Sequence, residues 1–130
     1  MPRKPSQEPR PTDAELAILR VLWQRGPSTV REVLDALNAE SEEPRAYTTI
    51  LRFLQIMTEK QLVVRQDGER GHVYTPKAPA ERTQRQMLRD FVDRVFGGSV
   101  QDLVLHALGS RKVSAEELRE IRKLLNDLEK

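Results

Sequence analysis

The sequence contains no cysteine, and only two of its 130 residues are histidine. The absence of cysteine excludes disulfide bonds, thiolate metal sites and a cysteine nucleophile. His72 and His106 lie far apart in the chain, which argues against a histidine-rich metal site. We therefore expect no metal and no cofactor. We interpret His72 as a strand residue or phosphate donor, and His106 as a packing or hydrogen-bonding residue of an apolar helix.

Long apolar runs are also missing, since none approaches the roughly 18–20 residues that a membrane span needs. The first residues are basic but no apolar stretch follows them, so we expect no signal peptide and a soluble, cytoplasmic protein. The sequence lacks a nucleophile elbow, a phosphate-binding glycine loop and an HExxH motif. We expect that the protein is not an enzyme.

An excess of charge of one sign is nearly absent, because the net charge is only +2 although 32% of the residues are charged. A surface that binds phosphate would have to arise from local clustering of basic residues. Hydrophobic residues make up 38% of the chain, which allows only a modest core. Cores of this size are often completed across a subunit interface.

Proline is concentrated at the N-terminus, where residues 1–11 hold four of the eight prolines. Arg3, Lys4 and Arg10 lie among them, and this composition predicts a disordered basic arm. Thr12, followed three residues later by a glutamate, has the pattern of a helix-capping box, so we expect order to begin there.

Residues 12–78 are predicted to form three helices and a hairpin. Apolar spacing and breaker residues place the helices at about 13–25, 30–38 and 45–60, with Ser28 or Thr29 as the cap of the second helix. The β-rich runs 62–66 and 72–76 flank a glycine-bearing turn and predict a hairpin. Three helices followed by a hairpin are typical of a winged helix-turn-helix domain. The predicted fold class is mainly α with a small β-hairpin.

The apolar face of the third helix is predicted to consist of Tyr47, Ile50, Leu54 and Met57. From Pro44 to Thr58 the sequence has no acidic residue, as a surface that approaches phosphates requires. Hydroxyls, amides and arginines on the opposite face can bond to phosphates and base edges. The predicted DNA contacts are Arg45, Thr48, Thr49, Arg52, Gln55 and, at the hairpin tip, Arg70. The alternatives are a solvated face that lacks acids by chance and, for Arg70, a solubilising charge beside Asp67 and Glu69.

Residues 79–130 are predicted to form a helical dimerisation domain. Its three apolar stripes are too wide for short helices to bury by themselves in about 50 residues. These helices either fold back on the first domain or, as we favour, form an interdigitated homodimer. The predicted dimer interface consists of Met87, Phe91, Val95, Leu118, Ile121, Leu125 and Leu128.

Four sequence runs together resemble the penicillinase repressor family, the BlaI/MecI group, over roughly residues 12–128. They are TDAELAILRVLWQRGPSTVREVLDAL, AYTTILRFLQIMTEKQLV, GHVYTP and FVDRVFGGSVQDLV. The resemblance implies a homodimeric winged-helix repressor that binds a pseudo-palindromic operator and controls β-lactamase, resistance or stress genes. It places Thr48 and Thr49 on the recognition helix. It also implies a membrane sensor or protease that acts on the C-terminal domain, because some members are inactivated by cleavage triggered by a membrane sensor.

The chain departs from the family pattern at positions that bear on the operator and on induction. Ile56 stands where a basic residue is common, and Gln61 replaces the glycine that usually ends the third helix in a left-handed conformation. His106-Ala107 aligns with the Asn-Phe bond that is cleaved in resistance repressors. The lack of cysteine argues against the copper-responsive members. A winged-helix module that binds proteins and not DNA is the alternative function.

Overall fold

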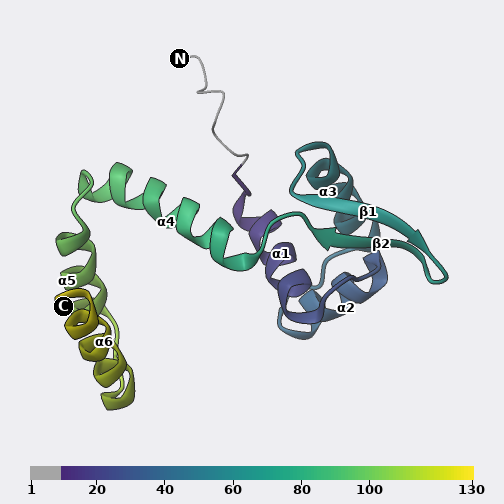
Figure 1. Cartoon of the computed structure of the whole chain (residues 1–130). Coiled ribbons are helices and arrows are strands. Elements are labelled where there is room, and N and C mark those ends of the chain that lie inside the picture. The colour runs from purple at the N-terminus through teal and green to yellow at the C-terminus, as the bar shows by residue number, and fades with distance from the viewer. Residues whose placement is uncertain (1–9) are drawn as a thin grey trace. The chain divides into compact units, whose positions relative to one another are not determined.

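The computed structural model describes residues 10–130, so the predicted basic arm lies outside the described residues except for its last two positions. The described residues form six helices and one hairpin (Figure 1). Their order is α1 (Asp13–Arg25), α2 (Val30–Ala39), α3 (Tyr47–Glu59), β1 (Val63–Gly68), β2 (Gly71–Pro76), α4 (Ala80–Phe96), α5 (Val100–Ser110) and α6 (Ala115–Leu128). The predicted fold class, mainly α with a small hairpin, is confirmed.

The chain divides into two compact units, one ending at Met87 and the other running from Leu88 to Lys130. The sequence placed a boundary before residue 79, whereas the structure divides the chain inside α4. The backbone just before α4 is bonded to α1, since the indole Nε1 of Trp23 donates to the carbonyl of Ala78 (3.0 Å).

Reciprocal capping boxes start α1 and α2. The hydroxyl of Thr12 accepts from the N–H of Glu15, and the carboxylate of Glu15 accepts from the N–H of Thr12. Thr29 and Glu32 make the same pair of bonds at α2. These bonds satisfy backbone donors that a helix start leaves without partners. Thr29 is therefore the cap of α2, and Ser28 is buried and pairs with β2.

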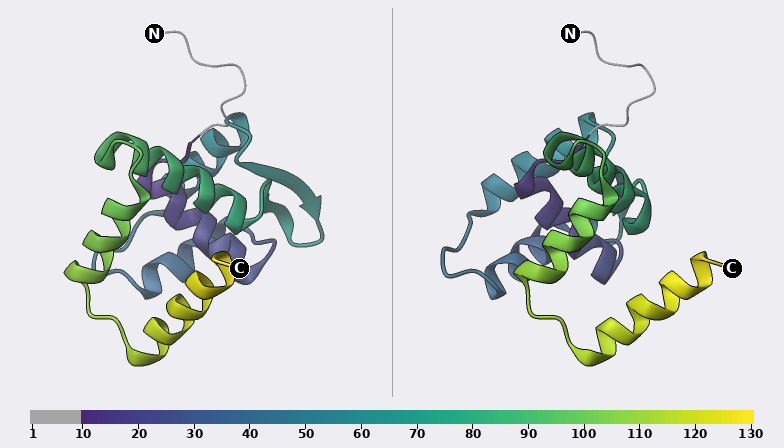
Figure 2. Two further views of the ribbon diagram at one scale, coloured as in Figure 1. Left: turned by 60° about the vertical axis from the view of Figure 1, so that its left-hand side comes forward. Right: turned by 90° about the vertical axis from the view of Figure 1, so that its left-hand side faces the viewer.

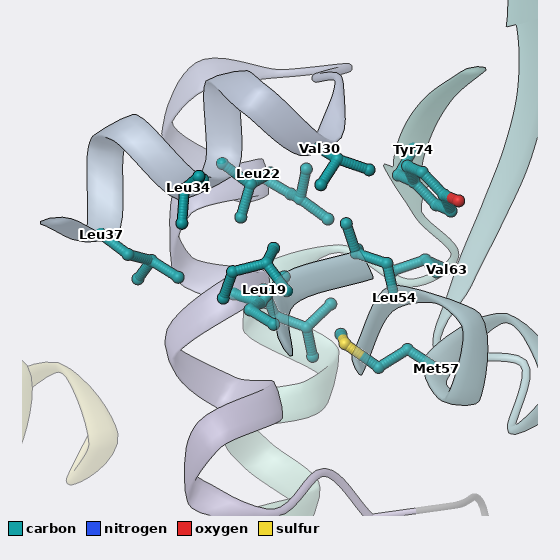
Figure 3. Close-up of a cluster of buried hydrophobic side chains, with 12 residues drawn as sticks. Leu19, Leu22, Val30, Leu34, Leu37, Leu54, Met57, Val63 and Tyr74 are labelled. Atoms are coloured by element: carbon teal, nitrogen blue, oxygen red, sulfur yellow. The ribbon is translucent and has the colours of Figure 1, made fainter. Parts of the chain in front are cut away.

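The core of the first unit fills the space between α1, α2, α3 and the hairpin (Figure 3). Ile50, Leu54 and Met57 of α3 are fully buried, as predicted. Tyr47 is not, because 42% of it is exposed. The predicted apolar face of α3 was wrong at this residue: Tyr47 lies in the first turn, where its ring lies beside the guanidinium of Arg31, 5.3 Å from the ring centroid.

The hairpin is longer and its turn is shorter than the sequence predicted. Its register runs from Val63 opposite Pro76 to Gly68 opposite Gly71, so only Glu69 and Arg70 form the turn. Gly71 has a φ of 96°, a conformation that disfavours residues with a Cβ. In Figure 1 the hairpin projects from the helices of the first unit as a narrow ribbon.

The turn that follows α3 keeps a left-handed residue although glycine is missing there. Gln61 has a φ of 64°. Its side-chain oxygen accepts a hydrogen bond from Nζ of Lys77 (2.6 Å), which ties this turn to the end of β2. Gln61 thus adopts the left-handed conformation that glycine favours, although it carries a Cβ.

In the second unit, α4 ends at Phe96 and is followed by Gly97 and Gly98, both with positive φ. Residues 111–114 join α5 to α6 (Figure 2). The hydroxyls of Ser99 and Ser114 cap α5 and α6. Among the described large apolar side chains of this unit, only Val92 is buried.

Candidate nucleic-acid interface

The outer face of α3 is a shallow hollow formed by side chains of one helix. The burial of Ile50, Leu54 and Met57 fixes the rotation of α3. Arg52 and Gln55 therefore point away from the core, whereas Leu51 and Phe53 pack against its edge. Thr48, Thr49, Arg52 and Gln55 are exposed, and Phe53 and Ile56 are half-buried. The hollow is lined by Thr48, Thr49, Arg52, Phe53, Gln55 and Ile56. Four of the six predicted DNA contacts thus lie together on one surface.

Arg45 precedes α3 and is positioned through its backbone. Oδ1 of Asn38 accepts from the N–H of Arg45 (2.8 Å), and Nδ2 of Asn38 donates to its carbonyl (3.2 Å). Its side chain is exposed. Asn38, at the end of α2, was not identified from the sequence, because nothing in its local pattern indicates a bond across a loop.

The start of α3 differs from those of α1 and α2. Its N-cap is Ala46, which has no side-chain oxygen and makes no capping bond, and no acidic residue lies in the first turn. The positive end of the helix dipole is therefore not offset locally, which favours an anion at this end. Arg31 and Tyr47 lie beside it and add a cation and a phenol.

Arg70, the sixth predicted DNA contact, lies apart from the α3 hollow. Its Nη1 is 2.7 Å from Oε2 of Glu32, and the same oxygen is 3.0 Å from Nη2 of Arg25. In the structure Arg70 therefore pairs with Glu32, an acid that the local sequence did not indicate. Asp67 instead pairs with His72 across the hairpin (2.6 Å).

Glu32 joins three segments of the first unit. Its Oε1 accepts from the N–H of Thr29 in the capping box, and its Oε2 meets both arginines. The hydrogen bond from the Thr29 N–H lowers the pKa of Glu32, burial opposes this effect, and the charges of Arg70 and Arg25 lower the pKa further. The pattern Thr29-x-x-Glu32 could have indicated the capping role from the sequence, but not the two arginines.

A second carboxylate, Glu15, joins α1 to the end of α3. Only 2% of Glu15 is exposed, and its Oε1 accepts from Nζ of Lys60 (2.6 Å). Burial raises the pKa of Glu15, but bonds from Lys60 and from the Thr12 N–H, with the charge of Lys60, outweigh it, so the pKa is lowered. This pair holds the C-terminal end of α3 against α1.

The predicted dimer residues lie on α4 and α6 of the chain. Met87, Leu118 and Ile121 are half-buried, whereas Phe91, Val95, Leu125 and Leu128 are 42–72% exposed. Val100, Leu105 and Leu124 are also more than half exposed. Apolar exposure on this scale is uncommon on the surface of a soluble monomer.

The described residues 10–130 contain no group of three or more histidine, aspartate or glutamate side chains that could hold a metal ion. The ring of His106 lies 5.3 Å from that of Phe96, and its Nδ1 is 2.8 Å from the carbonyl of Asp102. Over the same stretch, none of the helices is both long and apolar enough to cross a membrane.

Comparison with known protein families shows the family of this chain. The model of the penicillinase repressor family matches residues 11–127. The chain belongs to the penicillinase repressor family. The resemblance drawn from its sequence motifs is thereby confirmed, and so is the prediction that it is not an enzyme, because this family consists of transcriptional repressors.

Individual members of the penicillinase repressor family match along most of their length. The transcriptional regulator BlaI of Mycobacterium tuberculosis is 33% identical over 119 residues, which cover 90% of this chain and 83% of that protein. The penicillinase repressor of Bacillus licheniformis is 28% identical over 120 residues, or 92% of this chain and 91% of that protein. The solution structure of monomeric BlaI from Bacillus licheniformis with the blaP half-operator is 27% identical, with a TM-score of 0.49. It covers 58% of this chain and 89% of that one.

Proposed function

We propose that this DNA-binding transcriptional repressor reads its operator through the outer face of α3. The observation that carries the proposal is the hollow formed by Thr48, Thr49, Arg52 and Gln55 on a helix whose opposite face is fully buried. An arginine can bond to two acceptors of a guanine edge, a glutamine to an adenine edge, and a threonine methyl can contact a thymine methyl. No acid lies on α3 before Glu59, so phosphates can approach this surface.

Phosphate contacts are proposed for basic residues outside the α3 hollow. Arg45 lies just before the positive end of the α3 dipole, and Arg70 lies in the turn of the hairpin. Contacts of this kind fix the register of a protein on DNA and carry little sequence information. The basic residues Arg3, Lys4 and Arg10 add positive charge at the N-terminus.

The repressor is proposed to bind as a homodimer through its C-terminal helices. The support is the large apolar surface of α4, α5 and α6, which a second copy of the chain could cover. A two-fold dimer presents two copies of α3 to half-sites about one helical turn apart, or a multiple of it. Operator DNA is the partner, and the protein is proposed to act where that DNA lies, in the cytoplasm.

Derepression is proposed to act on residues 97–113, which comprise α5 and connect α4 to α6. Cleavage or loosening of this segment by a sensor-controlled protease would separate the apolar surfaces that hold the dimer. His106 and Ala107 lie within α5. A protease requires an extended backbone, so cleavage there would need local unfolding of α5.

The test is selection of fragmented genomic DNA by the purified protein, followed by footprinting of the enriched fragments. We expect a small set of fragments that share a two-fold site, protected at both half-sites. Enrichment that does not depend on sequence, or no enrichment at all, would contradict operator recognition. The second result would favour a protein-binding module.

A further inference from the structure

We propose that Glu32 holds Arg70 of the hairpin turn in an ion pair that DNA phosphate must displace, and so sets how tightly the repressor grips DNA. The inference rests on the proposed function, because it concerns the same phosphate contacts. It assigns a role in DNA binding to an acidic residue outside the α3 hollow.

The geometry of Glu32 supports this role. One carboxylate oxygen is used by the N–H of Thr29, so the carboxylate is held at the start of α2. The other oxygen meets Arg70 at 2.7 Å and Arg25 at 3.0 Å. The side chain of Glu32 is 27% exposed and that of Arg70 is 58% exposed, so the pair lies at the surface, within reach of another anion.

A phosphate oxygen and a carboxylate oxygen compete for the same guanidinium hydrogens. An exposed ion pair is weak, so a phosphate can displace it at small cost. While the pair stays intact, Arg70 contributes less to DNA binding than an unpaired arginine would. Glu32 also adds its own negative charge near the approaching backbone.

The test is a titration of fluorescent duplex DNA with the full-length protein at several salt concentrations. One duplex carries the site obtained by selection, and another of equal length has a scrambled sequence. Glu32→Gln keeps an oxygen for the N–H of Thr29 but loses the charge that holds the arginines. We expect affinity to rise roughly threefold to tenfold on both duplexes at ~0.1 M salt, since phosphate contacts do not depend on sequence.

The salt dependence should change with the affinity. Each arginine newly engaged with phosphate should steepen the log–log slope by about 0.9. Glu40→Gln is the matched control, because it removes one exposed acid at the other end of α2. An equal gain from Glu40→Gln would overturn the proposal, as would an unchanged or lower affinity of Glu32→Gln.

A double variant distinguishes the release of Arg70 from a general effect of removing one negative charge. In the background of Arg70→Gln, Glu32→Gln should raise affinity less than it does in the wild type. Equal gains in both backgrounds would overturn the proposal. If Glu32→Gln loses thermal stability, Glu32→Asp draws the charge back from Arg70 and should give a smaller gain in the same direction. If the wild type binds neither duplex, operator recognition itself fails, whereas a binding wild type with unresponsive variants refutes only this inference.

Discussion

At the scale of single residues, specificity is expected to depend most on Arg52. It lines the α3 hollow, one turn from Thr48 and Thr49, and its side chain is exposed. Arg52→Ala should weaken binding to the selected site by roughly 1–3 kcal/mol and relax specificity at one position. Titration of the selected and scrambled duplexes measures both effects. Arg20→Ala, which removes an exposed arginine of α1, is the control, and equal losses from the two variants would contradict this role for Arg52.

The buried pair of Glu15 and Lys60 should make stability depend on pH. Because the pKa of Glu15 in the folded state lies below its ordinary value of 4.5, its contribution is complete above about pH 4.5. That contribution is lost as the pH falls through the lowered pKa. Glu15→Gln should reduce the free energy of unfolding by about 1–3 kcal/mol at pH 7 and flatten its decline in acid. Urea unfolding at pH 7 and below pH 4 tests this. If the free energy of unfolding of Glu15→Gln falls in acid as much as that of the wild type, other acids cause the decline.

Local patterns predicted which residues lie on the outer face of α3 but not the partner of Arg70. Helical spacing places Ile50 and Leu54 on one face, so the opposite face follows directly from the sequence. The bond between Arg70 and Glu32 joins residues 38 positions apart, and no short-range pattern encodes it. Tyr47 was misplaced because periodicity alone does not show that the first turn of α3 extends past the core.

At the scale of elements, the connection between α1 and α2 depends on glycine. Gly26 has φ 88° and ψ −165°, a conformation that is open almost only to glycine. No atom lies within 4 Å of a Cβ added there, so a substitution would be penalised by the backbone alone. Gly26→Ala should destabilise the protein by about 1–3 kcal/mol.

Gly109 supplies the opposite case. It lies within α5, with no atom within 4 Å of an added Cβ and no positive φ. Gly109→Ala should stabilise the helix by roughly 0.5–1 kcal/mol. Thermal unfolding of both variants tests the pair, and a stabilising Gly26→Ala would show that the backbone at residue 26 is different from that described.

Most elements were predictable because strong local signals mark their ends. The capping box at Thr12 and the cap expected at Ser28 or Thr29 predicted helix starts that the structure keeps. The hairpin turn was predicted too long, because glycine at residues 68 and 71 indicates a turn without giving its register. The division inside α4 could not be predicted, since it follows from contacts between distant segments.

At the scale of the whole molecule, the apolar surface of α6 is expected to hold two chains together. Leu125 is 51% exposed, so a charge there should disturb an interface more than the fold of the chain itself. Leu125→Asp should convert dimers to monomers in sedimentation at micromolar concentration. It should also lower operator affinity by orders of magnitude, because two weak contacts would no longer be joined. Asn126→Asp adds the same charge at an exposed polar position of α6 and should leave both properties unchanged. Dimers that persist in Leu125→Asp would place the interface elsewhere.

Two copies of α3 are proposed to read one two-fold operator. The most direct test is sedimentation of the wild-type protein with labelled DNA carrying the selected full site or a single half-site. We predict two chains on each full site and binding to the half-site that is weaker by orders of magnitude. One chain per full site, bound as tightly as to the half-site or more tightly, would contradict recognition by a dimer.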